Sequence, residues 1–206
     1  MFEVKICGLT NGDDLQAAQD YGADYVGFVI YPKSPRGVTG MDVCRILDGV
    51  DLRARAVGVF VNEPVAEIEK IVSDCNLYAV QLHGDEIPAD YSGLPRVLWR
   101  SVKIADGIVV PEPMEWAAER YVLDANVPGE YGGTGVTADW AQAAMLADKH
   151  PVMLAGGLTA DNVADAVKAV LPAGVDTASG VEMEPGKKDH QKVKRFIEAA
   201  KNAATT

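Results

Sequence analysis

The 206-residue sequence has few of the residue types that build metal sites and disulfide scaffolds, with three histidines and three cysteines. The cysteines, at positions 7, 44 and 75, are too few and too scattered for a disulfide framework, and none forms the C-x-x-C pair of a zinc site. Three histidines also count against a metal-dependent enzyme that needs several ligands at one site. This composition fits a reducing compartment, so we expect a cytoplasmic protein without a bound metal.

Basic residues and long apolar runs are also scarce. Nineteen Lys and Arg stand against 30 Asp and Glu, which counts against nucleic acid as a partner, because binding there depends on basic side chains that neutralise phosphates. No apolar run approaches the roughly 20 residues of a membrane span, and residues 1–7 lack the basic start and long apolar stretch of a signal peptide. We therefore expect a small-molecule ligand, with neither nucleic acid nor a membrane as partner.

The sequence does contain an unbroken alternation of β-branched runs and segments with helical spacing. Eight runs are typical of strands, at residues 4–7, 25–30, 56–61, 78–82, 97–102, 121–123, 152–154 and 174–177. Helical spacing predicts helices at residues 11–21, 65–72, 139–146, 161–170 and 190–200, with a short, proline-interrupted helix near 114–118. Strands that alternate with helices indicate a parallel sheet.

Eight units of about 26 residues each favour an α/β fold that closes as a single (β/α)8 TIM barrel of near-minimal length. The alternative is an open doubly wound sheet, which usually has a G-x-G-x-x-G fingerprint after its first strand. Residues 8–12 do not match that fingerprint. No linker and no change in composition divides the chain, so we predict one domain over residues 1–206.

In such a barrel, functional groups lie where strands end and the following loops begin. Polar or reactive residues occur at these ends: Cys7, Arg36, His83, Asp124 and Asp176. Each also has a purely structural interpretation. Cys7 could be a small buried side chain and Asp124 a turn cap. Arg36 could be a solvated loop charge and His83 a hydrogen-bonded structural histidine.

The loops after the last two expected strands are the frequent phosphate site of this fold. Gly156 and Gly157 precede a helix start, and Ser179 with Gly180 could open a short extra helix. Glycines let the backbone approach a ligand closely, so these four residues are the predicted phosphate site. The structural alternative is that they only form tight turns. The glycine-rich segment 132–135 is either a loop that closes over substrate or a simple connection.

The motifs, taken together and in order, resemble the phosphoribosylanthranilate isomerase family. They are VKICGLT at 4–10, YPKSPR at 31–36, QLHG at 81–84, LD at 123–124, YGGTG at 131–135, LAGGL at 154–158, SGVE at 179–182 and PGKKD at 185–189. The resemblance implies an Amadori rearrangement of N-(5-phosphoribosyl)anthranilate in tryptophan biosynthesis, by acid–base chemistry with neither metal nor organic cofactor. It also implies a small phosphorylated substrate, and leaves a monomer or a homodimer open.

The same resemblance assigns roles to the strand-end residues. Asp124 is the implied general acid and Cys7 the implied general base, while Arg36 would clamp the anthranilate carboxylate; His83 and Asp176 join the substrate site. We infer in addition that Lys5, on the same strand face as Cys7, favours its thiolate, and that Asp176 raises the pKa of Asp124.

The chain departs from the family at two positions. Ala178 stands where the family commonly has Ser, and Val136 where a Lys is common, so side-chain contacts at both are in doubt. Two other functions compete with this one. An isomerase of the histidine-pathway aminoaldose needs a second anion site, and no second glycine-rich pair is visible. A catalytically silent metabolite-binding barrel predicts loss of Cys7 or Asp124, and both are present.

Overall fold

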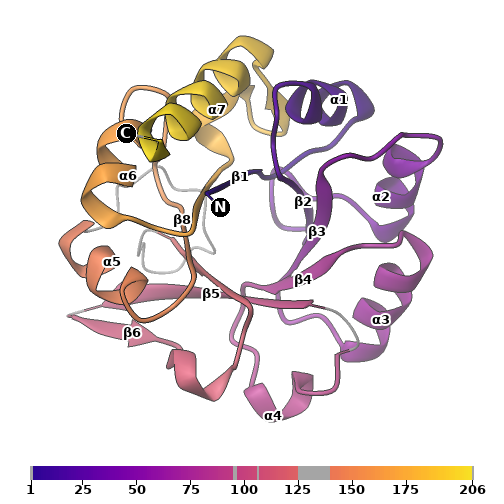
Figure 1. Cartoon of the computed structure of the whole chain (residues 1–206). Coiled ribbons are helices and arrows are strands. Elements are labelled where there is room, and N and C mark those ends of the chain that lie inside the picture. Colours follow the sequence, from indigo (N-terminus) through magenta and orange to yellow (C-terminus); the bar gives the residue numbers. More distant parts are fainter. Residues whose placement is uncertain (1, 95–96, 106, 125–139, 206) are drawn as a thin grey trace.

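Eight parallel strands form a closed ring in the computed structural model, which describes residues 2–94, 97–105, 107–124 and 140–205. In chain order they are β1 (Glu3–Ile6), β2 (Tyr25–Ile30), β3 (Arg55–Phe60), β4 (Ala79–Leu82), β5 (Val97–Ala105), β7 (Arg120–Leu123), β8 (Val152–Leu154) and β9 (Gly174–Thr177). Pairing of β1 with β9 and of β4 with β5 closes the ring, and the helices surround it (Figure 1). The predicted (β/α)8 barrel is confirmed.

The helices follow the strands in turn. They are α1 (Gly12–Asp20), α2 (Gly40–Leu47), α3 (Val65–Asp74), α4 (Pro88–Tyr91), α5 (Trp140–Ala147), α6 (Val163–Val170) and α7 (His190–Ala204), with 3-10 helices η1 (Pro113–Glu115) and η2 (Ser179–Val181). The predicted Asn11 cap of α1 is confirmed, since its side chain accepts from the Asp14 amide. No described helix is long and apolar enough to cross a membrane.

Two helices and two hairpins were not predicted from periodicity. Helix α2 is short but begins with a capping box, in which Thr39 and Asp42 each accept from the backbone amide of the other. Helix α4 is a single turn. Strand β6 (Ile108–Val110) pairs antiparallel with the end of β5, and β10 (Glu182–Glu184) pairs with β11 (Lys187–Lys188). The β10–β11 hairpin has a central place in the functional site.

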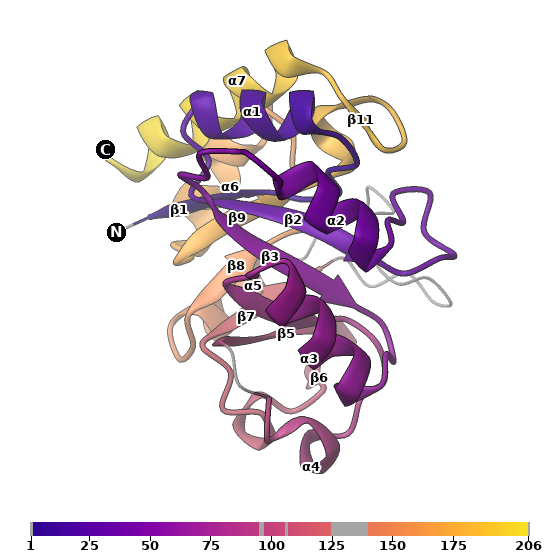
Figure 2. The same cartoon turned by 90° about the vertical axis from the view of Figure 1, so that its right-hand side faces the viewer.

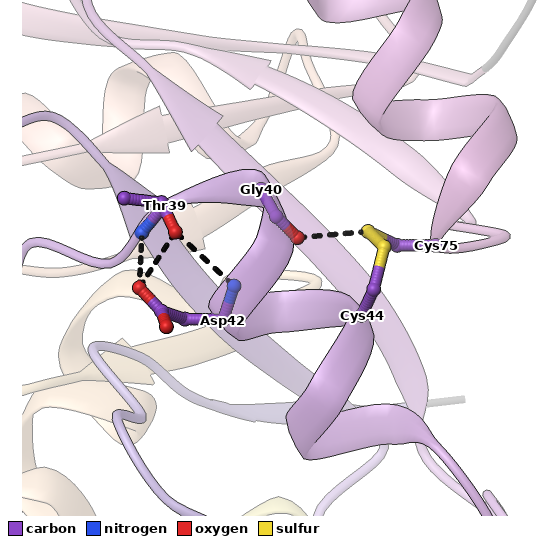
Figure 3. Close-up of a disulfide and its surroundings, with 5 residues drawn as sticks. All are labelled: Thr39, Gly40, Asp42, Cys44 and Cys75. Atoms are coloured by element: carbon purple, nitrogen blue, oxygen red, sulfur yellow. Dashed lines mark hydrogen bonds between the residues drawn. A yellow bond between two sulfur atoms is a disulfide. The ribbon is translucent and has the colours of Figure 1, made fainter.

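The cysteine prediction needs a correction. Cys44 of α2 and Cys75, which caps α3, form a disulfide with a Cα–Cα distance of 4.7 Å (Figure 3). They are 31 residues apart in sequence, about one strand–helix repeat, and consecutive helices of a barrel lie side by side. The close packing of these two helices is visible at Gly40, where an added Cβ would lie 2.7 Å from Ile71. The cysteine content therefore gives no support to a reducing compartment.

Alternation along the strands divides the buried residues into two layers. Side chains that point outward pack under the helices, whereas a second cluster fills the barrel interior. The interior cluster consists of Tyr25, Val57, Ala79, Trp99, Val122, Met153 and Ala155. The eight barrel strands run parallel, and the arrows of β2 and β3 point to the side where the loop after β2 and the β10–β11 hairpin lie, while both termini lie on the other side (Figure 2). The interior apolar cluster therefore fills the barrel, and the polar residues lie at the carboxyl ends of its strands.

Candidate active site

A cavity of about 610 Å³ lies at the carboxyl ends of the strands, a size ordinary for a small-molecule site. Every predicted site residue except Gly180 lines it. They come from six different strand ends, so the closed ring is what brings them together. Among the described residues, no group of three His, Cys, Asp or Glu side chains could hold a metal ion.

Cys7 is a free, buried cysteine directly after β1. Two residues earlier on the same inward face, the ammonium of Lys5 is fully buried and lies 2.9 Å from Oδ2 of Asp176. Gly27 of β2 makes room for both chains: a Cβ there would lie 2.7 Å from the Cys7 sulfur and 3.0 Å from Cε of Lys5. The thiol therefore occupies space that any larger residue at position 27 would fill.

Burial and the Lys5–Asp176 ion pair set the protonation of Cys7 and Lys5. Burial raises the pKa of Cys7, and Asp176 adds to that, while Lys5 and Lys188 act in the opposite direction. The predicted sign of the Lys5 effect holds, but burial outweighs it, so the thiol is the dominant form at neutral pH. Burial also lowers the pKa of Lys5, but Asp176 and Cys7 outweigh this and the net pKa is raised, so Lys5 stays an ammonium.

Asp124 follows β7, and His83 faces it across the cavity with Nε2 3.8 Å from Oδ2 of Asp124. Burial, with smaller contributions from Lys5 and Arg100, lowers the pKa of His83 to about 4, so the ring is neutral. Nδ1 of His83 lies 2.6 Å from the Ser101 hydroxyl, which also accepts from the Gln81 amide at 3.1 Å. The amide nitrogen of Gln81, which can only donate, also lies 3.3 Å from Nδ1, so the tautomer that accepts at Nδ1 and carries its proton on Nε2, toward Asp124, fits this network.

The roles assigned to Asp176 and to the loop after β7 stay predictions. Oδ2 of Asp176 pairs with Lys5, and Oδ1 is buried without a protein partner among the described residues, beside the cavity. That free acceptor suits a substrate hydroxyl. The glycine-rich segment 132–135 and Val136 lie outside the described residues.

The two predicted phosphate loops touch each other. Gly156 and Gly157 have φ of 82° and 67°, in the left-handed region that favours glycine. The Asn162 side chain donates to the Gly157 carbonyl and accepts from Thr159, so α6 begins two residues later than predicted. The extra helix predicted at Ser179 is confirmed as η2. Gly180 does not line the cavity: an added Cβ there would lie 1.9 Å from the Leu158 carbonyl oxygen.

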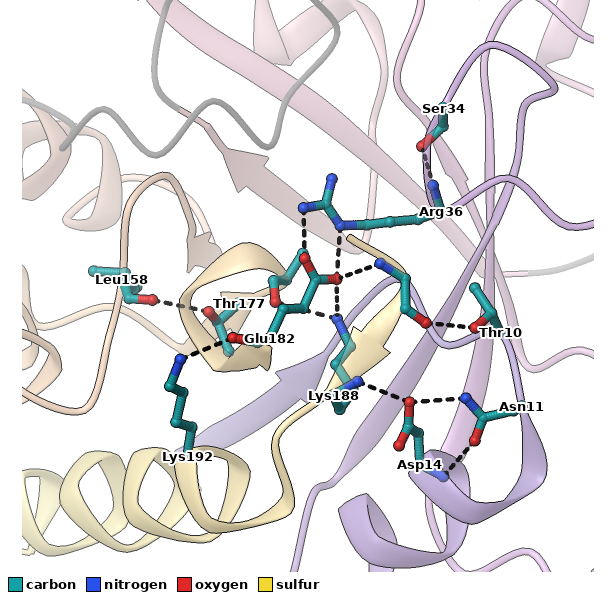
Figure 4. A network of polar contacts seen from close by, with 12 residues as sticks. Thr10, Asn11, Asp14, Ser34, Arg36, Leu158, Thr177, Glu182, Lys188 and Lys192 are labelled. Atoms are coloured by element: carbon teal, nitrogen blue, oxygen red, sulfur yellow. Dashed lines mark hydrogen bonds and ion pairs between the residues drawn. The ribbon is translucent and has the colours of Figure 1, made fainter. Parts of the chain in front are cut away.

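Arg36, from the loop after β2, has a partner that the sequence did not reveal (Figure 4). Its Nε and Nη2 donate to the two carboxylate oxygens of Glu182 at 2.8 and 2.7 Å. Lys188 donates to the same carboxylate at 2.9 Å and to the Ala178 carbonyl at 3.1 Å. Glu182 and Lys188 belong to the β10–β11 hairpin. The only signal for them in the sequence is that they lie in the SGVE and PGKKD motifs.

Known proteins similar in sequence and in fold show where the chain belongs. The family model described as N-(5'-phosphoribosyl)anthranilate (PRA) isomerase matches residues 4–199. The N-(5'-phosphoribosyl)anthranilate isomerase of Pelobacter propionicus is 43% identical over 201 residues, covering 98% of this chain and 96% of the relative. The crystal structure of the Thermotoga maritima enzyme is 38% identical with a TM-score of 0.87, covering 98% of this chain and 100% of that one.

A further solved structure holds a ligand. It is a phosphoribosyl anthranilate isomerase in complex with reduced 1-(o-carboxyphenylamino)-1-deoxyribulose 5-phosphate, 36% identical with a TM-score of 0.84. The alignment covers 98% of this chain and 100% of that one. Motifs, fold and relatives agree: this chain belongs to the phosphoribosylanthranilate isomerase family.

Proposed function

We propose that this protein isomerises N-(5-phosphoribosyl)anthranilate to 1-(2-carboxyphenylamino)-1-deoxyribulose 5-phosphate in tryptophan biosynthesis, by general acid–base catalysis. Membership of the family supports the reaction. The observation that carries the mechanism is that Cys7 and Asp124 line one cavity with the two phosphate loops and Arg36.

The ligand has three parts, and the cavity offers a group for each. The phosphate fits the loops at Gly156–Gly157 and Ser179, whose backbone amides are the donors available for an anion. The anthranilate carboxylate fits the guanidinium of Arg36, which lines the same cavity. The ribose then lies between them, where Cys7, Asp124 and Asp176 line the cavity.

The reaction needs one acid and one base. Asp124, in its protonated form, donates to the ring oxygen, and the C1′–O4′ bond breaks as the nitrogen lone pair forms a C1′ iminium. The Cys7 thiolate then takes the proton from C2′, which gives an enolamine that ketonises to the product. His83, with its proton on Nε2, faces the Asp124 carboxylate that remains after the first transfer.

The test is loss of substrate fluorescence when the purified protein is incubated with N-(5-phosphoribosyl)anthranilate. We expect turnover by the wild type and a loss of about 10²–10⁴ in kcat for Asp124→Asn, the usual cost of removing a general acid. Glu115→Gln, an exposed carboxylate in η1, serves as the matched control and should keep full activity. A wild-type protein that leaves the fluorescence unchanged would contradict the proposed function.

A further inference from the structure

The guanidinium of Arg36 is held on two sides in the protein without substrate. Its side chain lies across Gly8, where an added Cβ would be 2.6 Å from the Arg36 Cδ. On its other side, the Nε–Nη2 edge makes the paired hydrogen bonds to Glu182. The two side chains are only 11% and 5% exposed. Such a pair fixes the plane of the guanidinium as well as its position.

Glu182 is itself fixed from behind. Beside Arg36, its Oε1 accepts from the fully buried Lys188 ammonium at 2.9 Å and from the Gly186 amide at 3.3 Å. Lys192 donates to its backbone carbonyl at 2.8 Å. Burial alone raises the pKa of Glu182, but Arg36 and Lys188 outweigh that effect and the net pKa is lowered, so the carboxylate is ionised. The carboxylate is therefore fixed by protein groups alone.

The other edge of the guanidinium remains available. An arginine has five N–H donors, and Glu182 takes one from Nε and one from Nη2. The two donors of Nη1 and the second of Nη2 have no partner among the described residues, and Arg36 lines the cavity. These donors form the second edge on which a carboxylate can make a paired contact. With two positive groups and one negative, the cluster of Arg36, Lys188 and Glu182 keeps a net positive charge toward an anionic ligand.

We propose that Glu182 is a positioning residue: it holds Arg36 by the Nε–Nη2 edge so that the Nη1–Nη2 edge binds the aryl carboxylate of the substrate. The inference rests on the proposed function and adds a determinant of substrate choice to it. The alternative is that the substrate carboxylate displaces Glu182 and takes over its hydrogen bonds. The two arrangements predict opposite effects when Glu182 loses its charge.

The experiment compares Glu182→Gln with Glu184→Gln, which changes an exposed carboxylate two residues along the same strand. The ligands are N-(5-phosphoribosyl)anthranilate and the corresponding aniline compound, which lacks the carboxylate and is measured as a competing ligand. For Glu182→Gln we expect KM for the anthranilate substrate to rise about 3- to 10-fold, the cost of ordering one long side chain on binding. We expect an unchanged kcat and an unchanged inhibition constant for the aniline compound. Glu184→Gln should match the wild type.

A double variant shows whether Glu182 acts through Arg36. In an Arg36→Met background, Glu182→Gln should raise KM no further, because there is no guanidinium left to position. Glu182→Asp keeps the charge and the fold but cannot reach both nitrogens, and should give an intermediate KM. Thermal melts by circular dichroism confirm that each variant is folded.

Three results would overturn the inference. A lower KM in Glu182→Gln would show that the substrate displaces Glu182. If Glu182→Gln weakened the binding of the anthranilate substrate and of the aniline compound equally, Glu182 would only stabilise the η2 loop. If Glu182→Gln raised KM further in the Arg36→Met background, Glu182 would have a role independent of Arg36. The same variants are titrated with free anthranilate by its fluorescence. The binding of free anthranilate should weaken in Glu182→Gln even if the wild type proved inactive as an isomerase. This titration therefore distinguishes failure of the proposed function from failure of the positioning role of Glu182.

Discussion

Lys5 and Asp176 are register partners on adjacent parallel strands, and their side chains form a buried ion pair of 2.9 Å next to the Cys7 thiol. The pair leaves Cys7 with a cation that favours its thiolate and a carboxylate that opposes it. Burial then decides the outcome, and the pKa of the thiol is raised. The base of the proposed reaction is therefore mostly protonated in the resting protein at neutral pH.

The first prediction concerns pH and Cys7. The active form of Cys7 is the thiolate and its pKa is raised, whereas Asp124 acts in its protonated form, so the two titrations oppose each other in the wild type. In Asp124→Asn the general acid no longer titrates, and the residual kcat should increase with pH throughout the range from 6 to 8. Cys7→Ala should lower the wild-type kcat by about 10²–10⁴ with little change in KM, and should abolish the increase when added to Asp124→Asn. Steady-state kinetics across pH test both. A residual kcat of Asp124→Asn that is flat or falls with pH, or a wild-type kcat that survives in Cys7→Ala, would remove Cys7 from the role of base.

The second prediction links His83 to stability. Its pKa is about 4 in the folded protein against 6.5 for the free side chain, so below pH 6.5 the unfolded chain binds the additional proton. His83 should therefore lower the free energy of unfolding by about 2–3 kcal/mol as pH falls from 7 to 4. Urea unfolding of the wild type and of His83→Gln measures this. If the two proteins lost stability in parallel with falling pH, the ring would not be held neutral.

The third prediction tests the contact between the two loops proposed to bind phosphate, at residues 156–158 and 179–181. In Gly180→Ala, the new methyl group would collide with the backbone carbonyl of Leu158, which no side-chain rotation can relieve. We expect KM for the phosphorylated substrate, and the inhibition constant of inorganic phosphate, to rise about tenfold or more, since small displacements of binding groups are costly. Gly93→Ala, where an added Cβ meets nothing within 4 Å, is the matched control. Equal phosphate inhibition in both variants would contradict the assignment.

The fourth prediction concerns the disulfide. Closing a loop of 31 residues should stabilise the folded protein by about 3–4 kcal/mol through restriction of the unfolded chain. Cys44→Ser, or a reducing agent, should lower Tm accordingly, while Cys7→Ala should not respond differently from the wild type to reductant. A thiol titration of the unfolded, unreduced protein should find one thiol per chain and three after reduction. Three thiols before reduction would show that Cys44 and Cys75 are not bonded.

The sequence is enough to predict the barrel because its signals are local. Seven of the eight strands match within one residue at each end, and β5 extends three residues further because its end pairs with β6. Helix α2 is not among the predicted helices, and its clearest signal in the sequence is the Thr39–Asp42 capping box. Short hairpins such as β10–β11 have too few residues for a periodicity to show.

All the predicted site residues but Gly180 line one cavity, whereas their pairing could not be predicted. Cys7, Asp124 and the glycines are each at a strand end, which the fold alone makes significant. The partners of those residues come from distant positions: Glu182 is 146 residues from Arg36, and Cys44 is bonded one repeat away. Such contacts depend on ring closure and on side-chain reach, and a single sequence carries no signal for either. The same holds for the burial that raises the pKa of Cys7.

The Lys5–Asp176 contact also sets the order in which the protein can become functional during its synthesis. The two partners are 171 residues apart, and β1 meets one of its two neighbouring strands only when β9 has been made. At roughly 5–20 residues per second, the edge of β1 that carries Cys7 waits on the order of 10–30 s for that neighbour. Until then one edge of β1, next to Cys7, is unpaired, and an unpaired strand edge can pair with another chain and aggregate.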